Sequence, residues 1–256
     1  MLTYAYDGTL EGFLCCVFDA YVQHEQPDEI APTTGLQYRL EQRRHVVCTS
    51  KQHWQRVQCG IQQKLGWLAW EKVRACFCAT RKGKELLLYR YLVHGFSKGK
   101  AALSDLSHER VLPIENLYQE VGREVQRMMM FARFAKVPQG IYCATINPKH
   151  DVLPLIMGHF AARFNIQQFI IFDEVHQKAG LSERGGWYLA DAQDLHLPDA
   201  SSDDYQYQQL WKAFYDAIAI PQRRNEKLRR QFMPKRLWRN LTEMKPEAKS
   251  DNLSVL

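Results

Sequence analysis

The amino-acid sequence predicts an α+β protein with a helix-rich N-terminal part, a small ββαββ platform and basic C-terminal helices. Apolar residues that recur every three or four positions predict helices over most of residues 1–125, the expected N-terminal part. Short apolar runs bounded by Gly and Pro flank one helical stretch and predict the platform over residues 126–200. Cations crowd the helical stretch at residues 201–245, and residues 246–256 are expected to form a frayed tail.

Composition excludes several classes of protein. Hydrophobic residues make up 46% and charged residues 24% of the 256 positions, which is typical of a folded globular chain. No apolar run approaches the roughly 20 residues that a membrane span needs, and the N-terminus lacks the features of a signal peptide, so a cytoplasmic location is expected. The seven cysteines show neither Cys-x-x-Cys nor zinc-finger spacing. We therefore expect free thiols, no metal and no cofactor.

The predicted N-terminal part begins with a short strand at residues 4–6. Asp7 and Gly8 form a turn, and Thr9 caps a helix whose core stripe includes Phe13, Leu14 and, at its end, Tyr21. Residues 26–35 are expected to form a loop, and residues 39–47 a strand or an extended arm. Helices follow at 51–66, 67–80, 85–96 and 117–134, with a loose polar stretch at 95–99.

The predicted platform begins with a hairpin, in which residues 131–137 and 141–146 are joined by a Pro-Gln-Gly turn. Asp151 is expected to cap a helix that runs through residue 164, with Pro154 in its first turn. Strands follow at 168–172 and 187–190. An acidic, Ser-rich loop then leads to a helix whose apolar stripe contains Tyr207, Trp211 and Phe214.

The C-terminal segment is the most informative feature of the chain. Between residues 221 and 244, eight Lys and Arg face two acids, a local excess of +6 that equals the net charge of the whole chain. Residues 39–110 form a second basic region, with fifteen Lys and Arg against five acids. Cations with interleaved aromatic residues are typical of polynucleotide binding, whereas charge alone fits a solvated helical face equally well. The predicted nucleic-acid-binding residues are Arg223, Arg224, Lys227, Arg229, Arg230, Lys235, Arg236, Trp238 and Arg239.

A second group of residues invites an enzymatic interpretation. His150 and Asp151 are adjacent and suit an acid–base pair, with Asp7 as a further candidate catalytic residue and Asp173 nearby in sequence. His150 and His159 are about 900° of helical rotation apart, which argues against a shared metal. No sequence motif of a hydrolase, P-loop or dinucleotide-binding protein occurs. A structural role for the segment around His150 is the alternative.

Several blocks of the sequence resemble one bacterial family. They include Tyr6-Asp7-Gly8-Thr9, the run Pro148-Lys149-His150-Asp151, and the run Gln231-Phe232-Met233-Pro234-Lys235-Arg236. The chain is similar, from about Tyr4 to Met244, to bacterial proteins that are associated with DNA metabolism or DNA repair and share a domain of unknown function. Members of that family accompany a radical SAM protein, and some are fused to a uracil-DNA glycosylase-like domain.

The resemblance implies an association with DNA repair and a radical SAM partner, and it assigns no catalytic residue. We therefore expect a DNA-binding accessory protein rather than an enzyme. DNA, a radical SAM protein and a uracil-DNA glycosylase-like protein are the expected partners, and no membrane is involved. Two alternatives remain: a nucleic-acid-processing enzyme that uses His150 and Asp151, or an adaptor for the radical SAM protein that does not bind DNA.

Overall fold

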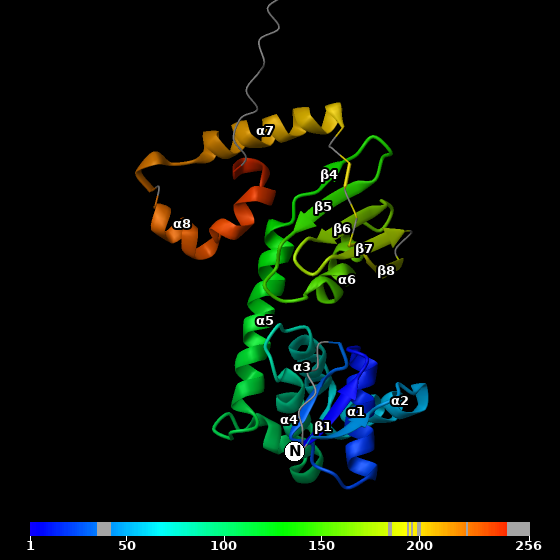
Figure 1. Ribbon diagram of the computed structural model, residues 1–256. Coiled ribbons are helices and arrows are strands. Elements are labelled where there is room, and N and C mark those ends of the chain that lie inside the picture. The colour runs from blue at the N-terminus through cyan, green and yellow to red at the C-terminus, as the bar shows by residue number, and fades with distance from the viewer. Residues whose placement is uncertain are drawn as a thin grey trace, which may run out of the picture. The chain divides into compact units, whose positions relative to one another are not determined.

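Two β-sheets organise the chain in the computed structural model (Figure 1), a three-stranded sheet of order β2-β1-β3 and a five-stranded sheet of order β4-β5-β6-β7-β8. The structure describes residues 1–34, 42–183, 186–193, 195, 197–198, 201–223 and 225–244. The chain divides into two compact units, Met1–Arg123 and Glu124–Leu256, and the long helix α5 (Leu112–Phe131) contains the boundary. The predicted α+β class is confirmed.

The first unit is built around a short parallel sheet. Strand β1 (Leu2–Tyr6) lies between β2 (Glu29–Pro32) and β3 (Arg43–Val46), and residues 3–6 are almost fully buried. Such a buried central strand is expected when helices cover a parallel sheet. Strand β2 falls within the expected loop, because four residues that end in proline carry no alternating pattern.

Helices make up most of the remainder of this unit. They are α1 (Leu10–Val22), α2 (Lys51–Gly60), which continues as a π-helical turn (Ile61–Leu65), α3 (Trp67–Phe77), α4 (Lys84–Lys98) and a 3₁₀ turn (Lys100–Ser104). As predicted, the Thr9 side chain caps α1 by accepting a hydrogen bond from the Gly12 amide.

Two local predictions in this unit are wrong. Tyr21, in the last turn of α1, is 78% exposed rather than buried. Residues 95–98 belong to α4 rather than to a loose stretch. Gly95 lets α4 pack tightly, since an added Cβ there would lie 3.0 Å from Leu65 and 3.1 Å from Leu103.

The second unit contains a mixed sheet with one parallel pair. Strand β4 (Ala135–Lys136) pairs with β5 (Tyr142–Ile146) as the predicted hairpin, and α6 (Leu153–Arg163) connects β5 to its parallel neighbour β6 (Phe169–Asp173). Strands β7 (Lys178–Glu183) and β8 (Gly186–Asp191) continue the sheet in antiparallel fashion. The sheet thus has one strand more than the predicted ββαββ platform. Strand β7 gave no signal because its sequence, KAGLSE, has little β propensity.

Helix α6 covers the sheet with an aromatic cluster. The ring of Phe134 lies 5.0–5.7 Å from the rings of Phe160, Phe164 and Phe169, in edge-on arrangements typical of packed aromatic side chains. Gly180 of β7 lies directly beneath Met157 of α6, and an added Cβ would be 2.2 Å from the Met157 sulfur. This packing fixes the crossover between β5 and β6, and with it the edge of the sheet at which both strands end.

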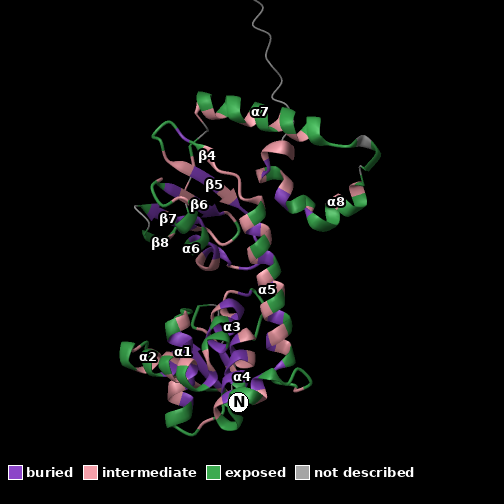
Figure 2. Ribbon diagram, turned by 180° about the vertical axis from the view of Figure 1, so that it is seen from behind, coloured by how far each residue is buried: buried purple, intermediate pink, exposed green. Residues whose placement is uncertain are grey.

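The C-terminal elements are α7 (Ser202–Ile218), a 3₁₀ turn (Pro221–Arg223), α8 (Glu226–Phe232) and the 3₁₀ segments η4 (Lys235–Asn240) and η5 (Thr242–Met244). The apolar stripe of α7 is not a core stripe, because no residue of α7 is buried (Figure 2). Met233, Leu237 and Leu241 are buried instead. No helix in the described part of the chain is both long enough and apolar enough to cross a bilayer.

Gly12 offers a direct test of the first unit. A Cβ at Gly12 would lie 2.2 Å from Asp7 Oδ1 and 3.0 Å from Thr49 Oγ1. We expect Gly12→Ala to destabilise the unit by about 1–3 kcal/mol, because this overlap outweighs the roughly 1 kcal/mol that alanine gains in a helix. Thermal unfolding followed by circular dichroism measures the change.

Gly122 in α5 is the matched control, because nothing lies within 4 Å of a Cβ placed there. Gly122→Ala is expected to leave the melting temperature unchanged or to raise it slightly. Equal melting temperatures for the two variants would contradict the steric role of Gly12.

Candidate functional site

Residues from two of the quoted sequence blocks, 148–151 and 231–236, meet at one edge of the second unit. Strands β5 and β6 are parallel, with Ile146 opposite Asp173, so their carboxyl ends lie at the same edge of the sheet. The loop of residues 147–152 leaves β5 there, and Asp173 ends β6. The crevice beyond the carboxyl ends of parallel strands is the usual place for a binding site in such sheets.

Glu124 on α5 holds the basic C-terminal segment at this edge through Arg236. Its side chain is 3% exposed and accepts two hydrogen bonds from Arg236 Nη2, at 2.6 and 2.7 Å. Glu124 Oε1 also accepts a 2.6 Å hydrogen bond from the Lys149 amide. Arg236 donates to the Asn147 carbonyl at 2.8 Å, and the Asn147 side chain donates back to the Arg236 carbonyl. These bonds join α5, the loop after β5 and η4.

Two further predicted phosphate-binding residues are paired within the chain. Arg239 Nη2 lies 2.6 Å from Glu174 Oε2, next to the end of β6. Arg229 pairs with Glu226 at 2.7 Å, and its guanidinium lies 4.7 Å from the ring centroid of Trp238. The Trp238 indole donates to the Met233 carbonyl at 2.9 Å, so this ring anchors the segment rather than standing free to stack on a base.

The remaining cations of the segment present their charge to solvent. They are Arg223, Lys227, Arg230 and Lys235, which are exposed and form no ion pair with any carboxylate in the described residues. Lys227 and Arg230 are three residues apart in α8 and therefore share a face of the helix. Arg224 lies outside the described residues.

Hydrogen bonds to Glu243 hold the end of the segment. Glu243 accepts from Arg133 at 2.8 and 3.3 Å and from the Trp211 indole at 3.2 Å. Burial alone would raise the pKa of Glu243, but the hydrogen bonds and charge of Arg133, a backbone hydrogen bond and the Trp211 indole together outweigh it, and the pKa lies below its usual value. The Glu243 contacts connect η5 to the segment after α5 and to α7.

The structure places the candidate catalytic residues in different surroundings. His150 is 2% exposed, and Asp151 forms an ion pair with Lys178. The expectation that Asp151 caps α6 is wrong: the N-cap is Val152, and no side chain caps the helix. The Asp151 carboxylate is held by the lysine at the start of β7 instead.

Asp7 belongs to the first unit, whereas His150 and Asp151 belong to the second. Its carboxylate accepts from the Thr9 amide at 2.9 Å and from the hydroxyls of Thr9 and Thr49, both at 2.6 Å. Burial alone would raise the pKa of Asp7, but these hydrogen bonds outweigh it and hold the pKa below its usual value. The contacts tie the turn after β1 to the segment after β3.

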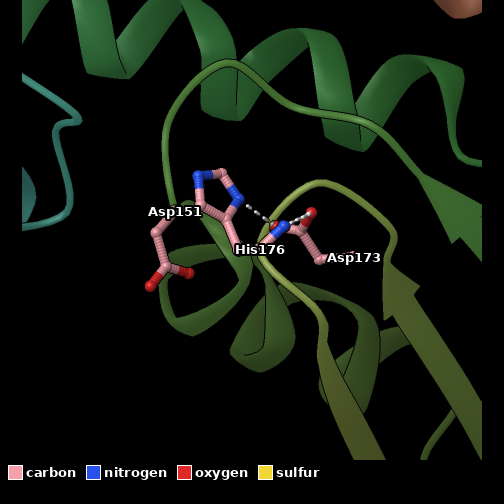
Figure 3. A group of neighbouring side chains, drawn as sticks. All are labelled: Asp151, Asp173 and His176. Carbon is pink, nitrogen blue, oxygen red and sulfur yellow. Dashed lines mark hydrogen bonds and ion pairs between the residues drawn. The ribbon is translucent and has the colours of Figure 1, made fainter. Parts of the chain in front are cut away.

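Asp173 and His176 form a close pair that sequence reasoning missed (Figure 3). Asp173 is fully buried, its Oδ2 lies 2.7 Å from His176 Nδ1, and its Oδ1 accepts from the amides of Val175 and His176. The hydrogen bond to Asp173 raises the pKa of His176 despite the opposing effect of burial. No motif marks this histidine. The available signal was an acid directly after a buried strand, followed by a histidine in the next turn.

The fold and site define a class of protein: a two-unit α+β protein whose basic C-terminal segment is fastened to the carboxyl edge of a mixed sheet. The chain belongs to the family of the domain of unknown function DUF4130, whose model matches residues 82–243. The matched region includes the buried acid Glu124, the loop after β5 and the basic segment.

Other comparisons add little. No curated protein matches the chain. One similar solved structure is described as a member of the s1p family of ribosomal proteins with a DHH domain. It is 10% identical with a TM-score of 0.31, over 70% of this chain and 73% of that chain, and a likeness at this level carries no argument about fold or function.

Removal of the Arg236 side chain tests whether its ion pair with Glu124 holds the segment in place. Arg236→Ala leaves the buried Glu124 carboxylate without its strongest partner, which we expect to cost about 2–4 kcal/mol locally. Hydrogen–deuterium exchange of residues 233–244 should therefore become faster. Arg230→Ala, which removes an exposed cation that pairs with no carboxylate of the described residues, is the control and should leave exchange unchanged. Equal protection in the two variants would contradict the role of Arg236.

Proposed function

We propose that this protein binds DNA through the exposed cations of its C-terminal segment and acts as an accessory protein in DNA repair or DNA metabolism. The observation that carries the proposal is that some basic residues of the segment form ion pairs with acids of the chain, whereas others are exposed and form none with the described carboxylates. Arg236 and Arg239 hold the segment in place through Glu124 and Glu174, which lie outside it, whereas Arg229 pairs with Glu226 within α8. The cations that make no such pair lie between and beside them and are available to phosphates.

This arrangement suits a polyanion for a physical reason. Phosphate contacts gain affinity by releasing condensed counterions, and a fastened segment does not have to be ordered on binding. Phe232, at the end of α8, is 65% exposed and offers an aromatic face beside the cations. Aromatic faces next to cations stack on unpaired bases, so single-stranded DNA is a suitable ligand as well as duplex.

The proposal also includes a radical SAM protein as partner, as the family resemblance implies, with a uracil-DNA glycosylase-like protein as a further partner. The exposed apolar stripe of α7 supports a protein contact, because the side chains of Tyr207, Leu210, Phe214 and Ile218 are each more than half exposed. Exposed apolar surfaces of this kind mark protein–protein contacts. An adaptor that uses α7 without binding DNA is the alternative outcome of the experiment below.

Salt-dependent binding provides the test. Fluorescence anisotropy with labelled single-stranded and duplex DNA should give a slope of log affinity against log salt near −3 to −4, as expected for about four phosphate contacts. The double variant Lys227→Ala/Arg230→Ala should weaken binding about 10-fold or more and reduce the magnitude of the slope by about 2.

The matched control is Lys136→Ala/Arg163→Ala, which removes two exposed cations of the same unit outside the basic segment. The control lowers the net charge by the same amount and should bind nearly as the parent chain does. Equal loss in both double variants would indicate a general charge effect, and no binding to either DNA would favour the adaptor.

A further inference from the structure

The cluster of Asp151, Asp173 and His176 has the composition of a metal-ion site (Figure 3). Each residue offers one carboxylate oxygen or imidazole nitrogen, and these three atoms lie within 4.8 Å of one another. The three residues come from the loop before α6, the end of β6 and the turn before β7. They thus converge at the carboxyl edge of the parallel strands, where the folded chain brings separate segments together.

Two atoms of the cluster are buried and have no hydrogen-bond partner among the described residues. They are His176 Nε2 and Asp151 Oδ1. A buried polar atom without a partner lowers stability, so folded proteins rarely leave one unless it has a role. Here one is an imidazole nitrogen and the other a carboxylate oxygen, and both are common metal ligands.

Asp173 prepares His176 for this role. An ionised carboxylate only accepts hydrogen bonds, so the 2.7 Å contact with Asp173 Oδ2 places a proton on His176 Nδ1. In the neutral imidazole, the lone pair is then on Nε2, the atom that lacks a partner. Histidines that ligate metals are usually held in this way by a carboxylate at the other ring nitrogen.

We propose that Asp151 Oδ1 and His176 Nε2 bind a divalent first-row transition-metal ion, with Asp173 orienting the imidazole. The mixed nitrogen and oxygen donors favour manganese, iron or zinc over magnesium, which prefers oxygen ligands alone. This site departs from the sequence-based expectation of no metal, which considered only cysteine spacing and the pair His150 and His159. It does not depend on DNA binding, and it is tested by metal binding alone.

Lys178 modulates the site. It lies opposite Asp173 in the β6–β7 register, and its ammonium forms an ion pair with Asp151 Oδ2, the oxygen that is not proposed as a ligand. A positive charge at this position repels a second cation. Loss of the lysine charge should therefore strengthen metal binding, a gain that a misfolded variant would not show.

Mn²⁺ is the suitable probe for the full-length chain. The chain contains seven cysteines, and thiolates favour zinc over the harder Mn²⁺. Titration followed by electron paramagnetic resonance, which detects free Mn²⁺, should show one bound ion per chain. Asp151→Asn and His176→Gln should each weaken binding at least about 10-fold, whereas Lys178→Met should strengthen it several-fold.

The controls are His159→Gln and Asp216→Asn, which change an exposed histidine and an exposed aspartate of the same unit. Their affinity for Mn²⁺ should stay within about twofold of that of the parent chain. The absence of stoichiometric Mn²⁺ binding by the parent chain would overturn the proposal. So would unchanged binding in Asp151→Asn and His176→Gln, or weaker binding in Lys178→Met.

Discussion

The arrangement of the second unit depends on one buried carboxylate. Glu124 projects from α5 into a region from which water is excluded, and an unpaired charge there would be costly. Arg236 and the Lys149 amide satisfy both of its oxygens. Arg236 also donates a hydrogen bond to the Asn147 carbonyl. The need to pair the buried Glu124 charge therefore fixes the position of η4 against the loop after β5.

The basic residues of the C-terminal segment therefore fall into two groups, those that stabilise the fold and those that are exposed for the proposed binding. A count of cations treats every Lys and Arg of residues 223–239 alike, but Arg229, Arg236 and Arg239 are engaged by acids of the chain. The pairs of Arg236 with Glu124 and of Arg239 with Glu174 hold the segment, and its other cations are exposed. The same carboxyl edge carries the Asp173–His176 pair, so a basic surface and a candidate metal site lie in the same unit.

The sequence predicted elements whose signal is local. Thr9 and the apolar spacing after it specified α1, and the Pro-Gln-Gly turn specified the β4–β5 hairpin. Strand β7 was not predicted, because its glycine is required by the packing of Met157 rather than by strand propensity. The apolar stripe of α7 predicted a helix, but periodicity shows only that a helix has an apolar face and not whether the chain itself covers that face.

The site was harder to predict because it depends on contacts between distant residues. The importance of Arg236 was visible from the crowding of cations, but its partner Glu124 lies on a helix 112 positions away. His176 had no motif, and only the parallel pairing of β5 with β6 brings its neighbour Asp173 to the loop that holds Asp151.

The central claim is that Glu124 and Arg236 act as one unit, and a double-mutant cycle measures this most directly. Glu124→Gln, Arg236→Gln and the double variant are compared by the hydrogen-exchange protection of residues 233–244. We expect the double variant to lose much less than the sum of the single losses, with a coupling of at least about 1 kcal/mol. Additive losses would show that the two residues stabilise the segment independently and would contradict the account.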